Sequence, residues 1–202
     1  MNKSQQGIKV YSATAEHCVY AEKICQIIEQ AVAVKGTGIA KRNPDYIKQK
    51  MLEGKAVIAL TAENKFAGFC YIESWGSQKN YVANSGLIVA PEYRGLGLGK
   101  SIKQSVFELS RKKFPEAKLF GITTSLAVLK INSALGYKPV TFCQLTDDET
   151  FWAGCKTCVN FDILQRTNRQ HCLCTAMIYD PDWEKQNKQE TKQYAAESSV
   201  SL

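Results

Sequence analysis

A glycine-rich segment between two basic residues carries the most specific chemistry in this sequence. Glycines stand at positions 95, 97 and 99, between Arg94 and Lys100, after an apolar run and before a long helical pattern. Glycine accepts positive φ and lets another molecule approach the backbone. Successive free N–H groups, added to the positive end of a helix dipole, bind phosphate oxygens. The segment therefore predicts a phosphate site on the backbone from Arg94 to Lys100.

Three other kinds of turn can contain such glycines. A plain strand–helix turn needs glycine only to avoid steric strain. A dinucleotide-binding turn needs other glycine spacing and a place near the first parallel strand, whereas this turn falls mid-chain. A nucleotide P-loop ends as Gly99-Lys100-Ser101 does, but its opening glycine would fall at Arg94. The P-loop therefore does not fit.

Two motifs resemble the GNAT superfamily of N-acetyltransferases. The segment 94–99 is similar to that family's Arg/Gln-x-x-Gly-x-Gly/Ala signature, and residues 86–93 are similar to the approach strand before it. Residues 130–137 resemble the family's late N-x-x-L-G-F/Y helix end. The resemblance covers Ile8 to Leu145. It implies an acyl-CoA N-acyltransferase fold and acetyl-CoA, or another acyl-CoA, as the donor.

The resemblance also implies where the donor lies. Its pyrophosphate would rest on the amides from Arg94 to Lys100, and its pantetheine arm would pair like an extra strand with residues 87–89. The thioester would reach the gap where this strand and residues 119–124 splay apart. The expected cofactor-binding residues are Leu87, Ile88, Val89, Arg94, Gly95, Leu96, Gly97, Leu98, Gly99, Lys100 and Asn132.

The family's reaction is direct attack of an amine on the thioester. The amine must lose a proton, the oxyanion needs a donor such as the N–H near Val89, and the CoA thiolate must be protonated. The family's usual acid is a tyrosine at the position of Asn132, and an amide donates protons poorly. Asn132 binds the cofactor arm or substrate in one interpretation, and caps or packs its helix in the other. Glu73 is the best candidate base; its alternative is a solvated charge at a strand end.

Acceptor recognition is expected in the loop between the first two helices. Lys41 and Arg42 can hold a carboxylate, with Thr37 adding a hydrogen bond, although a charged pair in a loop is usually surface. Thr123 is expected to line the same cleft. A carboxylate grip favours an amino acid such as glutamate as the acceptor.

Four of the eight cysteines form two close pairs. Cys155 and Cys158 form the first pair, and 13 residues separate Cys158 from the second pair, Cys172 and Cys174. This spacing favours a structural zinc site, with His171 as an alternative ligand, if the second pair lies in an extended strand. A redox dithiol is the other possibility. The remaining cysteines fit small buried hydrophobes.

The elements around these residues predict an α/β fold. Helical patterns over 16–34 and from Pro44 to 53 precede strands over 56–61, 66–75 and 81–90. A helix over 99–113, a strand over 117–124, a helix over 126–135 and a strand over 137–145 follow. This order predicts a mixed, mainly antiparallel sheet with helices on both faces.

Composition divides the chain into three expected parts. Residues 7–146 form the N-acetyltransferase domain, 147–183 a cysteine-rich extension, and 184–202 a polar tail that is expected to be disordered. The sequence shows no secretory signal and no membrane-spanning run, so a cytoplasmic location is expected. The net charge of +7 fits both a nucleic-acid partner and a polyanionic cofactor, so it does not distinguish them.

The leading hypothesis is transfer of an acetyl or other short acyl group from acyl-CoA to the amine of a small metabolite. The alternatives are a non-catalytic acyl-CoA-binding regulatory module and a zinc-dependent nucleic-acid-binding protein. Nucleic acid is the less favoured partner, since no long basic run or aromatic-basic repeat is present. A homodimer is a further prediction.

Overall fold

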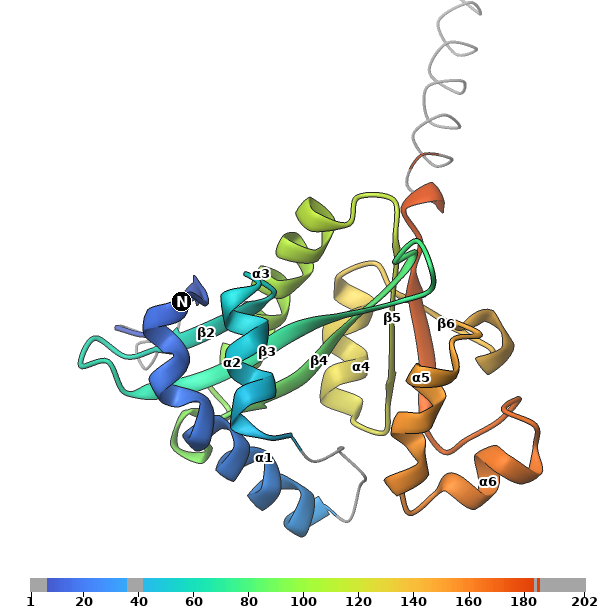
Figure 1. The fold of residues 1–202 in the computed structure, drawn as a ribbon, viewed down its shortest axis with the longest axis horizontal. Coiled ribbons are helices and arrows are strands. Elements are labelled where there is room, and N and C mark those ends of the chain that lie inside the picture. The colour runs from blue at the N-terminus through green and yellow to red at the C-terminus, as the bar shows by residue number, and fades with distance from the viewer. Residues whose placement is uncertain (1–6, 36–41, 184, 186–202) are drawn as a thin grey trace, which may run out of the picture.

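One seven-stranded sheet organises the chain (Figure 1). The computed structural model describes residues 7–35, 42–183 and 185. The strand order is β1-β2-β3-β4-β5-β7-β6. The strands are β1 (Lys9–Ser12), β2 (Ala56–Leu60), β3 (Phe66–Trp75), β4 (Tyr81–Val89), β5 (Lys118–Thr123), β6 (Lys138–Val140) and β7 (Thr175–Tyr179).

The sheet is mixed and mainly antiparallel. Strands β1 to β4 form an antiparallel meander, whereas β4 and β5 pair in parallel. Both β6 and β5 pair antiparallel with β7. The predicted fold class and the antiparallel first half are therefore confirmed.

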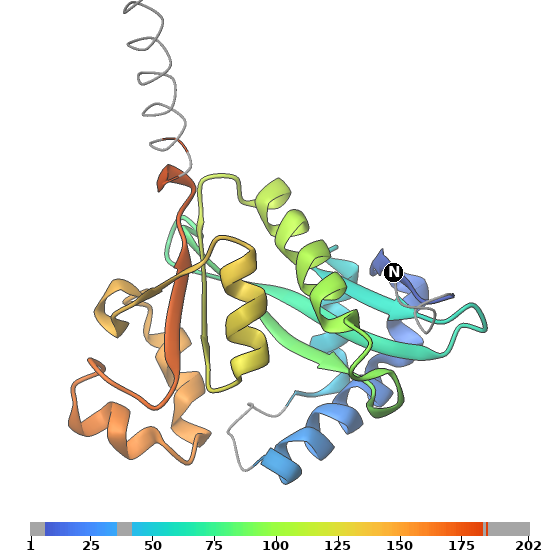
Figure 2. The same cartoon turned by 180° about the vertical axis from the view of Figure 1, so that it is seen from behind.

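Helices cover both faces of the sheet (Figures 1 and 2). The helices α1 (Ala21–Lys35) and α2 (Pro44–Leu52) lie on one face; α3 (Leu98–Lys113) and α4 (Leu126–Ala134) lie on the other. The shorter α-helices are α5 (Glu149–Ala153) and α6 (Phe161–Arg166), and the 3₁₀ turns are η2 (Ala15–Tyr20), η3 (Pro91–Tyr93), η4 (Phe142–Gln144) and η5 (Gly154–Thr157). No helix within the described ranges is both long and apolar enough to span a membrane.

Local sequence explains where α2 and α4 begin. Asn43 accepts a hydrogen bond from the Tyr46 amide at 2.7 Å, and Pro44 has the fixed φ and missing N–H that suit a first helical position. Ser125 accepts from the Val128 amide in the same way. These caps satisfy amide donors that have no partner inside the helix.

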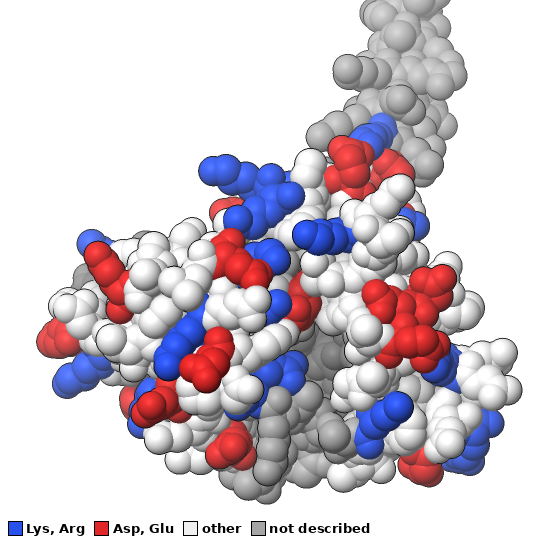
Figure 3. Space-filling model, viewed as in Figure 1, with Lys and Arg blue, Asp and Glu red and all other residues white. Residues whose placement is uncertain are grey.

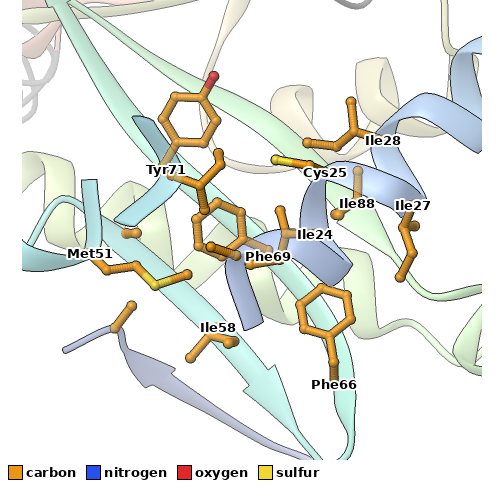
Figure 4. Close-up of a cluster of buried hydrophobic side chains, with 14 of the residues drawn as sticks. Ile24, Cys25, Ile27, Ile28, Met51, Ile58, Phe66, Phe69, Tyr71 and Ile88 are labelled. Carbon is orange, nitrogen blue, oxygen red and sulfur yellow. The ribbon is translucent and has the colours of Figure 1, made fainter. Parts of the chain in front are cut away.

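Two apolar layers hold the first half of the sheet between its helices. Figure 4 shows Ile24 and Ile28 of α1 and Met51 of α2 against Phe69 and Tyr71 of β3; all five side chains are buried. On the opposite face, buried residues of α3 pack on β2, β3 and β4. These layers fix the position of β3 and of the edge of β4.

The predicted domain boundary at 146/147 does not separate two structural units. Strand β7, which comes from the expected extension, lies between β5 and β6 in the main sheet. Trp152 of α5 and Leu164 of α6 are buried in one cluster with Phe120 of β5. The predicted strand over 137–145 is also shorter than expected, since it ends at Val140 and continues into η4. Except for Lys185, the expected tail lies outside the described residues.

A β-bulge distorts β4 at its middle. The pairing with β3 moves from Tyr71–Ser85 to Phe69–Ile88, so β4 carries one extra residue opposite Cys70. Gly86 adopts φ +64 there, and a Cβ at this position would lie 2.4 Å from a ring carbon of Tyr71. Only glycine fits this backbone.

We therefore expect Gly86→Ala to lower the free energy of unfolding by about 2 kcal/mol or more, because it adds both left-handed strain and a clash. Chemical denaturation measures the loss. Gly154→Ala is the matched control, since Gly154 has helical φ −63 and no atom within 4 Å of the added Cβ. The control should be neutral or up to about 1 kcal/mol more stable. Equal effects in the two variants would contradict the role given to the bulge.

Candidate functional site

The two central parallel strands separate part-way along their length. The registered pairs between β4 and β5 run from Tyr81–Lys118 to Ala83–Phe120. Beyond that pair, β5 continues to Thr123 with β7 as its partner, and β4 continues to Val89 with β3 as its partner. A wedge-shaped opening between β4 and β5 results, as the family resemblance implied.

Val89 directs its backbone into this opening. Ala90 donates to the Ala67 carbonyl at 2.9 Å, which makes these two residues a hydrogen-bonded pair of the antiparallel ladder. The adjacent pair, Gly68 and Val89, is then a non-hydrogen-bonded pair whose amides point outward. The Val89 N–H therefore points away from β3, to the side that β5 has left.

The glycine turn at the end of β4 is open. Gly95 and Gly97 have φ +76 and +79, and a Cβ at Gly95 would meet no atom within 4 Å. Gly97 is the residue before α3, and its carbonyl accepts from Lys100 at 3.0 Å and Ser101 at 3.4 Å. The amides of Leu98 and Gly99 therefore precede the first hydrogen bond within the helix, as expected for an anion site.

The charges at this turn oppose the preference of the helix dipole. The first turn of α3 contains no acidic residue and includes exposed Lys100, although acidic residues stabilise the positive end of a helix. Arg94 donates from Nε to the Val89 carbonyl at 3.0 Å, so its side chain lies across the end of β4. Arg94 and Lys100 thus lie beside the N-terminus of α3. A bound anion there would stabilise both the helix dipole and the two positive charges.

Asn132 has an unsatisfied oxygen inside the protein. Its side chain is 2% exposed, and its Oδ1 is the one buried side-chain oxygen or nitrogen of the described residues without a hydrogen-bond partner. Its Nδ2 lies 3.7 Å from the position of a Cβ on Gly121, the first β5 residue beyond the last pair with β4. An unpaired buried acceptor costs about 1–3 kcal/mol, which favours a ligand donor at this place.

Glu73 lies on the opposite face of the sheet, in a buried ion pair. Its carboxylate accepts from Lys50 of α2 at 2.8 Å, and the two side chains are 15% and 11% exposed. Burial raises the pKa of Glu73 to about 7, although the nearby Arg42 charge acts in the other direction. Burial also lowers the pKa of Lys50. The predicted base therefore titrates near neutral pH, which suits proton transfer.

Arg42 belongs to the same cluster. Its guanidinium donates to the Tyr71 hydroxyl and lies 5.9 Å from the ring centroids of Tyr46 and Tyr71. The Lys50 ammonium lies 4.9 Å from the centroid of Tyr46. The structure thus brings Arg42 and Glu73, 31 positions apart in the chain, around one aromatic pair.

The other residues predicted to bind the acceptor do not join the cluster of Arg42 and Glu73 in the described structure. Thr37 and Lys41 lie outside the described residues. Thr123 ends β5, and its hydroxyl accepts from the Ser125 amide at 3.0 Å, so it also shapes the turn into α4. It stays on the β5 side of the opening.

The two halves of the site lie on opposite faces of the sheet. Glu73 and Arg42 lie with α1 and α2, whereas the glycine turn leads into α3, and Asn132 lies on α4. Figure 3 shows that the α1/α2 face is hollowed between these helices and the α5/α6 side, with basic side chains bordering the hollow and acidic ones gathered over α5.

The structure does not support the predicted zinc site. Among the described residues, no group of three or more metal-ligand side chains is placed to hold a metal. All eight cysteines are free thiols. Cys155 lies in η5, and Cys172 and Cys174 precede β7, so the second pair is not part of a strand. Beyond the effect of burial, the thiols of Cys172, Cys158 and Cys155 nevertheless all contribute to raising the pKa of Cys174. Burial first, then neighbouring thiols, raises the pKa of Cys155 to about 11.

A cavity of about 790 Å³ lies apart from these features. It is lined from α5 to α6 and includes Trp152, Leu164 and Arg169 but none of the predicted site residues. Arg169 makes a two-pronged ion pair with Glu149, at 2.6 and 2.7 Å. The Arg169 fork therefore already has a carboxylate partner.

The sequence analysis did not point to two side chains in or beside the site. Lys50 lies on the short helix α2, and Lys103 lies in the middle of α3. Lys50 gave no sequence signal, because its partner Glu73 lies on another element. Lys103 had one, since it takes a sheet-facing position on α3 and is 3% exposed.

Residues 29–127 match the model of the acetyltransferase (GNAT) family. This match covers β2, β3, β4, the glycine turn, α3 and β5. This part of the chain is therefore similar to the GNAT acetyltransferase family. A comparison with curated proteins finds no significant match.

Solved structures share the fold at low identity. N-acetylglutamate synthase from Neisseria gonorrhoeae, complexed with coenzyme A and N-acetyl-glutamate, is 13% identical with a TM-score of 0.59 over 86% of this chain. This chain spans only 35% of that protein's length.

Two further structures match most of their own lengths. Rv2747 from Mycobacterium tuberculosis, in complex with CoA, is 15% identical with a TM-score of 0.57, over 85% of this chain and 98% of that one. A phosphinothricin acetyltransferase from Sinorhizobium meliloti, in complex with AcCoA, is 13% identical with a TM-score of 0.57, over 86% and 88% of the two chains. These likenesses establish the acyl-CoA N-acyltransferase fold.

The buried environment of Glu73 gives a direct prediction. Its carboxyl should titrate near pH 7 rather than near 4.5, because burial disfavours the charged form. Carbon-13 NMR of protein labelled at glutamate side chains measures this midpoint, and loss of the signal in Glu73→Gln assigns it. The exposed Glu63, whose pKa is lowered by its hydrogen bond with Thr61, is the internal control. A Glu73 midpoint at or below 4.5 would contradict the buried-base interpretation.

Proposed function

We propose that this chain, which carries a GNAT-family N-acyltransferase domain, moves an acetyl group from acetyl-CoA to the amine of a small amino acid. The observation that carries the proposal is the opening between β4 and β5. The Val89 amide points into it, and the free end of α3 lies at the end of the same strand. An extended cofactor arm has one backbone edge to pair with and one anion site at its end.

The donor would be held on the α3/α4 face. The amides of Leu98 and Gly99, with Arg94 and Lys100, would bind the pyrophosphate. The edge from Leu87 to Val89 would pair with the pantetheine arm, and Asn132 Oδ1 would accept from one of the arm's amides. A backbone N–H on the same edge, toward the closed end of the opening, would then stabilise the oxyanion formed at the thioester carbon.

The acceptor would enter from the other face. Glu73 is the proposed base, because a carboxyl with a pKa of about 7 can take a proton from an ammonium or an adding amine near neutral pH. Arg42 would hold the acceptor's carboxylate in a charge-assisted hydrogen bond, with Tyr71 and Tyr46 fixing its guanidinium. The similar synthase bound to N-acetyl-glutamate supports an amino acid as the acceptor.

The eight free thiols support a cytoplasmic location, since reducing compartments keep cysteines unpaired. The alternative of a zinc-dependent nucleic-acid-binding protein has no support from a metal site among the described residues. A binding module without catalysis differs from an enzyme in one measurable respect, the release of CoA when an amine is added.

Charge reversal at Lys100 tests the cofactor site. Lys100→Glu places an acid in the first turn of α3, which should stabilise the free protein by about 0.3–1 kcal/mol. The same change should weaken acetyl-CoA binding by about tenfold or more, because the carboxylate repels the pyrophosphate. Thermal shift and calorimetric titration with acetyl-CoA measure the two effects.

Lys112→Glu is the matched control, an exposed lysine in the last turn of the same helix. It changes the net charge equally but should leave acetyl-CoA affinity unchanged. If both variants lost the same affinity, the change in net charge would explain the loss, and the proposed pyrophosphate site would be contradicted. Thiol release from wild-type protein with acetyl-CoA and an amino-acid panel then separates the enzyme from a binding module.

Arg42→Met tests the acceptor. Wild-type enzyme should use glutamate at least about tenfold better, in kcat/KM, than 4-aminobutyrate, which lacks the α-carboxylate. The variant should lose most of that preference and keep its activity on the decarboxylated amine. Steady-state CoA release measures both substrates. A preference unchanged by the substitution would exclude Arg42 as the carboxylate partner.

A further inference from the structure

Lys103 is a buried cation on the sheet-facing side of α3. It is 3% exposed, and it follows Gly99 by four residues and Lys100 by three, so it lies one turn deeper than the proposed pyrophosphate site. Lysine is almost never fully buried unless it is paired. This position therefore requires an explanation.

Lys103 has no acidic partner. None of the ion pairs among residues 7–35, 42–183 and 185 includes it. Its ammonium lies 5.5 Å from the centroid of the Tyr137 ring, and the Cys70 thiol is the ionisable group that acts on it. Burial lowers the pKa of Lys103 to about 8. The folded protein thus keeps a costly charge that an anionic partner would stabilise.

The neighbours of Lys103 touch β4 where the opening begins. The Tyr137 hydroxyl donates to Asn84 Oδ1 at 3.4 Å, and the Cys70 thiol donates to the Ser85 carbonyl at 3.3 Å. Asn84 and Ser85 are the first β4 residues beyond the last pair with β5. Lys103 therefore lies beneath the closed end of the opening, on the α3 face.

We propose that Lys103 receives the sulfur of coenzyme A, by donating a hydrogen bond and then a proton to the thiolate that leaves. This inference rests on the proposed function and deepens it. The reaction needs an acid for the thiolate, and Asn132 stands where the expected tyrosine is missing. The path from the α3 amides along Leu87–Val89 to the closed end of the opening leads toward Lys103.

The proton balance closes without another reactant. The acceptor nitrogen attacks the thioester carbon, so a C–N bond forms and the C–S bond breaks with its electron pair on sulfur. The Lys103 ammonium gives a proton to sulfur and becomes a neutral amine, while Glu73 takes the proton that nitrogen loses. Solvent exchange returns Lys103 and Glu73 to their starting states. The products are the amide and the CoA thiol.

Ionisable groups around Lys103 fit this assignment. Cys70 on β3 stays protonated at neutral pH, since burial raises the pKa of its thiol to about 11. Burial likewise raises the pKa of Tyr137, with Cys70 and Tyr179 adding and Arg111 opposing. The facing groups are therefore neutral near pH 8, which leaves the incoming sulfur as the anion for Lys103.

Binding of CoA and of desulfo-CoA, which lacks the sulfur, tests the proposal without relying on turnover. Wild-type protein should bind CoA about tenfold tighter than desulfo-CoA in calorimetric titrations at pH 8, where thiolate and ammonium can coexist. Lys103→Met should bring the ratio of the two affinities to about one and leave desulfo-CoA affinity unchanged. Lys112→Met is the control and should keep the wild-type ratio.

The melting temperature of Lys103→Met separates a functional from a structural role. Replacing an uncompensated buried charge by an apolar side chain of similar length should leave the melting temperature equal or higher. A lower melting temperature with an unchanged CoA preference would overturn the proposal, as would a wild-type ratio of one.

If the variant does not fold, ultraviolet titration of the CoA thiol bound to wild-type protein tests the proposal. A pKa of the CoA thiol that falls on binding supports it, and a pKa that does not fall overturns it. Failure of wild-type protein to bind either ligand would refute the proposed function itself, and this inference with it.

Discussion

The separation of β4 from β5 is the constraint on which the rest of the structure depends. Parallel strands normally satisfy each other's amides along their whole length. Here β4 has β5 as a partner only through Ala83, and the Val89 amide then points into the space between them. The antiparallel β7 supports β5 beyond that point, so the segment after residue 146 completes the sheet and lets the wedge persist. The bulge at Gly86 sets the direction of the edge that lines it.

Several residues around the wedge lower the stability of the unliganded protein. A lysine occupies the positive end of α3, another lysine is buried without an acid, and a buried asparagine oxygen has no donor among the described residues. Each of these costs free energy in the unliganded protein. Their positions on α3 and α4, beside one opening, give them a common explanation in one elongated, negatively charged ligand. Natural sequences break local folding rules mostly where function requires it.

The sheet also divides the proposed chemistry between its faces. The groups proposed to bind phosphate and sulfur lie with α3 and α4, whereas Glu73, Lys50 and Arg42 lie under α1 and α2. The acceptor side is dry enough to raise the pKa of Glu73 to about 7, and Lys50 gives that carboxylate a cationic partner. Donor and acceptor can then enter separately and meet only where the strands part.

The sequence by itself determined the local features. The β-prone run after the turn at 63–65 predicted β3 residue for residue, Pro44 marked the start of α2, and glycine spacing located the turn before α3, because these signals act over a few neighbouring positions. Only the tertiary structure decided which distant residues meet. It placed β7 between β5 and β6, put Lys50 against Glu73 and Lys103 beside Tyr137, and left the cysteine pairs without metal geometry. Burial and partner distance set these properties, and both arise from the packing of elements that are far apart in the chain.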